Sequence, residues 1–82
     1  MNLIARIDGN GTCFIGKHGE HSEWVKRKNV KPVTVVKNEK GNDIVMPEHI
    51  EIALSKHKYQ GCAIHFFDEE VQQFYNNYFE NQ

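Results

Sequence analysis

The sequence predicts an α+β fold in which residues 2–46 form a small twisted antiparallel sheet and a helix, a strand and a second helix follow. The first half consists of short β-branched and aromatic runs between glycine-containing turns, which is the pattern of hairpins. In the second half apolar residues recur at helical spacing, once after Pro47 and again after Asp68. The chain has only 82 residues, of which 39% are hydrophobic and 26% charged, so we expect residues 1–82 to form a single compact domain.

Two strands and the turn between them open the chain. Residues 8–11, with the sequence Asp-Gly-Asn-Gly, tolerate positive φ and predict a tight reversal. The runs at residues 3–7 and 12–15 are the expected strands on either side of it. Residues 23–28 alternate around Trp24, which predicts a further strand with one face in water.

A second hairpin completes the predicted sheet. Residues 33–36 are β-branched throughout, and Pro32 suits the start of a strand. Residues 38–42 supply the turn, and residues 44–46 supply the returning strand. Strands and hairpins of these lengths resemble those of SH3-like barrels, so a closed barrel over residues 2–46 is the alternative to an open sheet. This resemblance implies no function.

The segment at residues 48–58 is predicted to be a helix. Pro47 fits the first helical position, where its missing N–H costs nothing, and Gly61 is a natural stop. Apolar positions recur at i, i+3, i+4 and i+7, a set that consists of Ile50, Ala53, Leu54 and His57. Every second residue from position 50 to 54 is also apolar, so a strand is the alternative here.

The chain is expected to end in a strand and a helix. In residues 62–67 the odd-numbered and the even-numbered positions are both apolar, apart from His65. This is typical of a strand covered on both faces. Asp68 is a good N-cap, and two glutamates follow it in the first helical turn. Apolar residues then recur at helical spacing as far as Tyr78, so an amphipathic helix closes the chain.

No motif in the chain carries a catalytic mechanism, so we expect a protein that is not an enzyme and has no cofactor. Residues 11–18 nearly spell a P-loop, but His18 stands where the metal-binding hydroxyl should be. A small domain of this kind is expected to act by binding another protein. Eight asparagines beside eight lysines are typical of an AT-rich coding genome, which makes a phage-type inhibitor or regulator of a host protein the specific hypothesis.

The aromatic residues of the last helix are the predicted partner-binding site. This set covers more than one helical face and consists of Phe74, Tyr75, Tyr78 and Phe79. A helix that packs on a small sheet buries a stripe only about 100° wide. The surplus rings are therefore expected to anchor a protein partner, or to be buried in a homodimer. The alternative is one wide buried face above the strands.

A nucleic-acid-binding module is the alternative function. The residues that suggest it are Trp24, Lys26, Arg27, Lys28 and Lys31. On a strand, the ring and alternate lysines would share one face and could meet unpaired bases and phosphates. Residues 1–46 hold eight basic side chains against five acidic ones, whereas residues 47–82 hold two against six. The net charge of −1 is nonetheless far from that of a dedicated nucleic-acid binder.

A small zinc-binding domain is the second alternative. The candidate ligands are Cys13, His18 and His21, because two loop histidines and a thiolate from the preceding strand could reach one ion. Otherwise the loop histidines face solvent.

The chain is expected in the cytoplasm. Its two widely separated cysteines are not a disulfide framework and indicate thiols in a reducing compartment. No run approaches 18 apolar residues, and residues 1–7 are too short for the apolar part of a secretory signal, so no membrane partner is expected.

Overall fold

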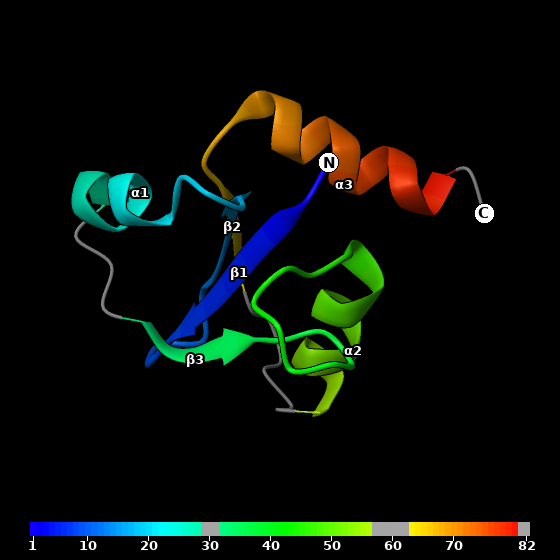
Figure 1. The fold of residues 1–82 in the computed structure, drawn as a ribbon, viewed down its shortest axis with the longest axis horizontal. Helices are drawn as coiled ribbons and strands as arrows, with labels where there is room; N and C mark the ends of the chain where they lie inside the picture. Colours follow the sequence, from blue (N-terminus) through cyan, green and yellow to red (C-terminus); the bar gives the residue numbers. More distant parts are fainter. Residues whose placement is uncertain (29–31, 57–62, 81–82) are drawn as a thin grey trace.

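The computed structural model of the chain describes residues 1–28, 32–56 and 63–80, and it confirms the predicted α+β class (Figure 1). The described strands and helices are β1 (Leu3–Asp8), β2 (Cys13–Lys17), α1 (His21–Lys28), β3 (Pro32–Val36), α2 (Pro47–Lys56), β4 (Ile64–Phe66) and α3 (Glu69–Glu80). None of the helices within the described ranges is long and apolar enough to cross a bilayer.

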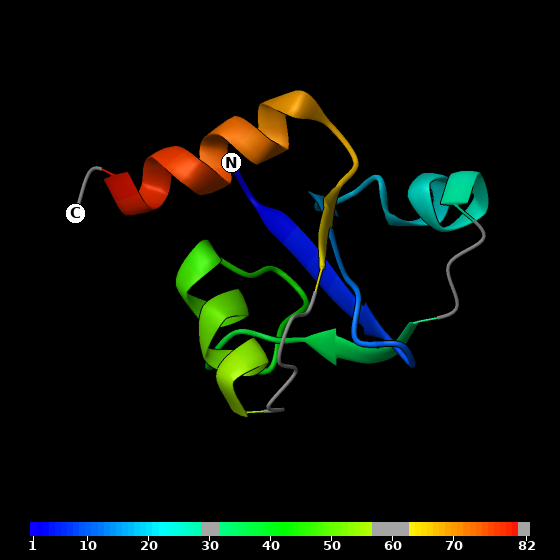
Figure 2. The same ribbon diagram turned by 180° about the vertical axis from the view of Figure 1, so that it is seen from behind.

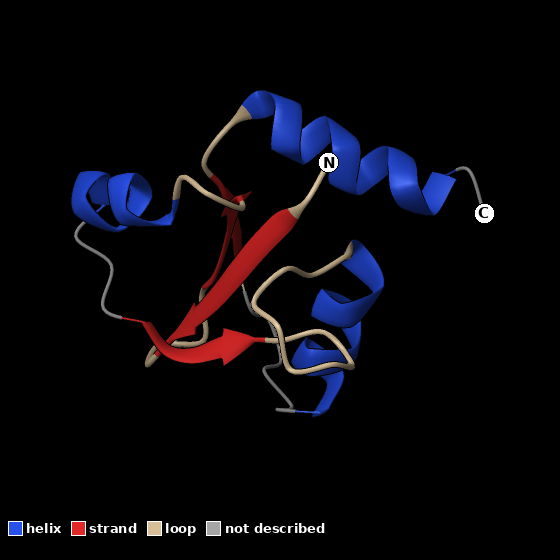
Figure 3. Ribbon diagram, viewed as in Figure 1, coloured by secondary structure: helices blue, strands red, loops and turns tan. Residues whose placement is uncertain are grey.

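The four strands form one mixed, open sheet in the order β3-β1-β2-β4 (Figure 3). β1 pairs antiparallel with β2, as the predicted hairpin requires. It also pairs antiparallel with β3, which was not predicted, and β4 pairs parallel with β2. The SH3-like barrel alternative is wrong, because β3 and β4 lie at opposite edges of the sheet and do not pair with each other.

The strand predicted at residues 23–28 is wrong, because this segment forms the helix α1. The chain turns at Gly19, where φ is 101°, and the carbonyl of Glu20 then accepts hydrogen bonds from the N–H groups of Glu23 and Trp24 at 3.1 and 3.2 Å. Trp24 is fully buried in this segment, whereas Glu23, Lys26 and Arg27 are exposed. One buried residue does not distinguish a period of 2 from one of 3.6.

The returning strand predicted at residues 44–46 is also wrong. The turn before it forms, with the Asn38 N–H donating to the Asn42 carbonyl at 2.9 Å, but β3 has already ended at Val36. Val45 instead makes an isolated antiparallel bridge with Leu3 and donates its N–H to the Leu3 carbonyl at 2.9 Å. Val45 thus pairs with the N-terminal end of β1, beyond the point where β3 ends.

The helix predicted after Pro47 is confirmed over Pro47–Lys56, which excludes the strand alternative there, and His57 and Gly61 lie outside the described residues. β4 occupies part of the strand predicted at residues 62–67. The prediction that this strand is covered on both faces is wrong, because β4 lies at the edge of the sheet and its residues are only half-buried. α3 begins immediately after Asp68, as predicted.

The main core lies between one face of the sheet and the helices α2 and α3. Its members from the strands include Leu3, Ala5 and Ile7, and Ile50 and Val71 join them from the two helices. Because side chains alternate along a strand, the even-numbered residues of β1 and β2 lie on the other face. Figures 1 and 2 show α1 on that other side of the sheet.

Trp24 anchors α1 to this second face and is completely buried. It packs over Gly16: a Cβ atom at that position would lie 3.4 Å from the Cε2 and Nε1 atoms of Trp24 and 3.6 Å from Cδ2 of Phe67. There is room for one methyl group and no more. The lack of any side-chain atom beyond Cβ at this position is what lets the indole lie against the strand.

We expect Gly16→Val to lower the free energy of unfolding by about 1–3 kcal/mol, because its extra methyl groups would displace Trp24. Gly16→Ala should stay within about 1 kcal/mol of the wild type. Urea unfolding followed by Trp24 fluorescence measures both. Valine favours strands more than alanine does, so a Gly16→Val protein more stable than Gly16→Ala would contradict the packing argument.

Candidate functional site

The predicted aromatic site on α3 divides into buried and exposed residues. Tyr75 is only 5% exposed and belongs to the main core, where its ring lies 5.2 Å from that of Phe66. Its hydroxyl donates a hydrogen bond to the carboxylate of Glu51 on α2. Tyr75 therefore joins α3 to α2 within the fold.

The remaining three rings of α3 are more accessible. Phe74 is half-buried and packs against the core, and Tyr78 is also half-buried. Phe79 is 39% exposed, with its ring 5.3 Å from those of Tyr75 and Tyr78. Of the four predicted residues, Tyr75 is therefore buried in the core, Phe74 and Tyr78 are partly accessible, and Phe79 is exposed.

The predicted basic face is not assembled as a strand would assemble it. Trp24 is buried, while Lys26 and Arg27 are exposed. Residues two apart on a helix point in different directions, so Trp24 and Lys26 do not share a face. Lys28 is the last residue of α1, and Lys31 lies outside the described residues.

The candidate zinc ligands are also separated. Cys13 is fully buried in the main core, whereas His18 is exposed in the turn after β2, and His21 is the first residue of α1. Among the residues that the structure describes, no group of three or more histidine, cysteine, aspartate or glutamate residues could hold a metal ion.

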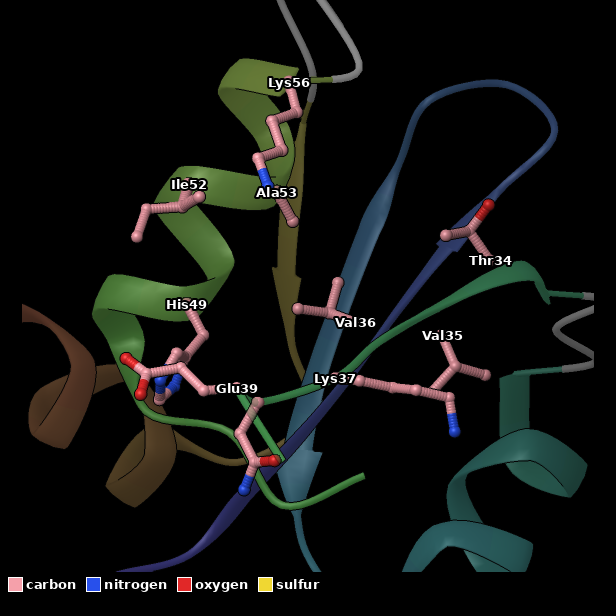
Figure 4. A pocket seen from close by; sticks show the side chains of 10 residues that line it. Thr34, Val35, Val36, Lys37, Glu39, His49, Ile52, Ala53 and Lys56 are labelled. Atoms are coloured by element: carbon pink, nitrogen blue, oxygen red, sulfur yellow. The ribbon is translucent and has the colours of Figure 1, made fainter. Parts of the chain in front are cut away.

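The structure reveals a groove that the sequence analysis did not predict. It lies between β3 and α2 and has a volume of about 400 Å³ (Figure 4). α2 contributes His49, Ile52, Ala53 and Lys56, and β3 contributes Thr34, Val35 and Val36. The α2 residues are spaced i, i+3, i+4 and i+7, a second helical stripe beside the one used for the core. Ile52 within that stripe is 53% exposed, which is unusual for a large apolar side chain.

One wall of the groove is the outer edge of β3. The N–H groups of Asp8 and His18 donate to the carbonyls of Thr12 and Asn2, each at 3.0 Å, so the even-numbered residues of β1 direct their backbone groups toward β2. The odd-numbered residues therefore face β3, where Ala5 and Ile7 are opposite Val36 and Thr34.

It follows that the backbone of Val35, between those two residues, points away from β1. Within the described ranges no strand pairs with this edge of β3. An N–H and a carbonyl group at the open edge can accept an added strand.

A hydrogen bond and an ion pair fix two of the polar side chains that line the groove. The Nδ1 atom of His49 accepts a hydrogen bond from the Met46 N–H at 2.9 Å, which places the proton of a neutral ring on Nε2. Lys37 is paired with Asp43 at 3.1 Å. Lys56 has no ion-pair partner among the described residues, so it can attract an anionic group to the groove.

No protein-family model, curated protein or solved structure matches this chain. The arrangement of its own residues therefore carries the functional argument.

The contact between Tyr75 and Glu51 predicts a loss of stability at alkaline pH. Burial and then the hydrogen bond to Glu51 raise the pKa of Tyr75 far above its ordinary value of 10.0. Above about pH 10 the unfolded chain loses this proton while the folded protein retains it, so the free energy of unfolding falls as the pH rises.

In Tyr75→Phe this decline should be shallower than in the wild type. Denaturant unfolding at about pH 8, 10 and 11 measures the difference. Parallel pH profiles for the two proteins would show that Tyr75 is not held in its neutral form by the fold.

Proposed function

We propose that this protein is a non-enzymatic binding module that takes an extended segment of a partner protein into the groove between β3 and α2. The observation that carries the proposal is the β3 wall of the groove, where the outer strand edge, with which no described strand pairs, lines an open groove. A partner segment would add to the sheet as a further strand beside β3.

The groove suits this kind of ligand better than a small molecule. In strand addition, main-chain hydrogen bonds supply affinity and pockets for alternate side chains supply specificity. Val35 offers the main-chain groups, and the exposed Ile52 with Ala53 beside it offers an apolar surface for a side chain of the added segment. Lys56 at the same groove favours a segment with an acidic residue.

Tyr78 and Phe79 are proposed as a secondary contact for the same partner. The proposal retains the expectations of a cytoplasmic protein without a cofactor and of a phage-type inhibitor of a host protein. An inhibitor of this type would act by occupying a segment that its target needs for another contact. A homodimer through the β3 edges is the competing use of the groove.

The test uses a displayed library of random peptides about ten residues long. Peptides enriched on the wild-type protein are synthesised, and their dissociation constants are measured by isothermal titration calorimetry. Ile52→Asp should weaken binding at least about tenfold, because it places a charge in the apolar part of the groove. Ser55→Asp is the matched control, since Ser55 is exposed on the same helix outside the groove, and it should bind as the wild type does.

Hydrogen exchange of the Val35 amide gives a second readout. Exchange at this amide should slow when a selected peptide binds, because an added strand would accept its hydrogen bond. A library that yields no binder, or equal weakening by both variants, would reject the proposal. Self-association that is lost in Ile52→Asp would assign the groove to a homodimer instead.

A further inference from the structure

A row of four side chains crosses the face of the sheet opposite α2 and α3. Arg6 of β1 is paired with Val35 of β3 on one side and with Phe14 of β2 on the other, and Phe14 is in turn paired with His65 of β4. Directly paired residues point to the same face of a sheet. One residue from each strand therefore stands in line, and none of the four belongs to the main core.

Aromatic rings gather at the Phe14 and His65 end of the row. The rings of Phe14 and His65 are 5.6 Å apart, and Phe67 lies 5.8 Å from Phe14 in a stacked arrangement with 30° between the planes. The buried Trp24 supports Phe67 from the side of α1, with ring centroids 4.4 Å apart. Phe14, His65 and Phe67 all remain partly exposed.

Positive charge accompanies these rings. Arg6 is paired with Phe14 in the sheet and has no ion-pair partner among the described residues. The Nε atom of Arg6 and the Nε2 atom of His65 are buried, and neither has a hydrogen-bond partner among the described residues. These two unpartnered nitrogens lie beside the rings, at a cost in stability.

The flanking elements add more basic than acidic side chains. Asp8 is on the same face of β1, but its carboxylate accepts hydrogen bonds from the N–H groups of Asn10 and Thr12 and forms no ion pair with Arg6. α1 adds Lys26, Arg27 and Lys28 against a single Glu23. Arg27 lies three residues after Trp24, on the neighbouring part of the helix surface, and is exposed.

We propose that this face binds single-stranded nucleic acid, with a base stacked on Phe14 and a backbone phosphate at Arg6. Aromatic rings on an open four-stranded sheet stack unpaired bases, and adjacent arginines neutralise the phosphates. The surface is distinct from the groove between β3 and α2. Trp24 contributes as the support behind Phe67, and the contact with the base belongs to the sheet.

A single strand suits the face better than an acidic peptide does. An acidic peptide would use the cations but would leave the partly exposed rings of Phe14 and His65 without a planar partner. A nucleotide offers an acceptor-rich phosphate and a flat base together, which is the pairing that Arg6 and Phe14 present side by side.

The test measures fluorescence anisotropy of a labelled oligothymidylate of about ten nucleotides. The wild type should bind it at about 50 mM salt and much more weakly at about 200 mM. Phe14→Leu keeps an apolar side chain but removes the ring, and should weaken binding at least about fivefold. Arg6→Gln should weaken it to a similar degree and reduce its salt dependence. Lys40→Gln is the control for charge, because this exposed lysine lies in the turn at residues 38–42, away from the row, and should bind as the wild type does.

Thermal unfolding of each variant separates lost binding from lost folding, and Arg6→Gln tests the site even if Phe14→Leu proves unstable. No binding at low salt would overturn the proposal. Equal weakening by Lys40→Gln and Arg6→Gln, with no effect of Phe14→Leu, would also overturn it, because the protein would then attract anions without a defined site. A peptide of about ten glutamates that binds as tightly as the oligonucleotide would assign the face to acidic protein segments instead.

Discussion

The arrangement of the whole molecule depends on the pairing of β1 on both of its sides. Its even-numbered residues direct their backbone groups to β2, and its odd-numbered residues direct theirs to β3 and, beyond the end of β3, to Val45. The same alternation assigns the side chains of Leu3, Ala5 and Ile7 to the main core. One strand thus fixes the register of the sheet, the position of its core and the location of its open edge.

Helices cover the two faces of the sheet to different extents. On one side α2 and α3 together cover the core, and the hydrogen bond from the Tyr75 hydroxyl to the Glu51 carboxylate joins the two helices. On the other side the short helix α1 is anchored by Trp24 over Gly16. Eight residues are too few for a helix to cover a four-stranded sheet, and the side chains of Arg6, Phe14 and His65 are left partly exposed. The second face is more accessible because one helix of eight residues packs on it, whereas two longer helices pack on the first.

Turns and helix starts were predicted correctly where a few neighbouring residues determine them. The Asp-Gly-Asn-Gly turn, Pro47 at the start of α2 and Asp68 before α3 each mark a boundary that the structure retains. Residues 23–28 were mistaken for a strand because one buried tryptophan does not define a period. The partner of Val45 could not be predicted either, since a neighbouring hairpin strand and the distant Leu3 satisfy its backbone equally well. The groove and the aromatic row both join residues that are far apart in sequence, so only the register and the packing of the sheet bring them together.

Val35 belongs to both proposed surfaces, and this has a geometric consequence. Its backbone groups lie at the open edge of β3 and line the groove, while its side chain stands at the end of the row that continues through Arg6, Phe14 and His65. A partner strand added beside β3 would place the residue opposite Val35 on the same face of the sheet. The row would then extend from four residues to five, with the fifth supplied by the partner. A partner segment with a basic residue at that position would lengthen the cationic surface beside Arg6, and one with an acidic residue would oppose it. The chemistry of one ligand at the edge can therefore influence the affinity of the opposite face without any change in the fold.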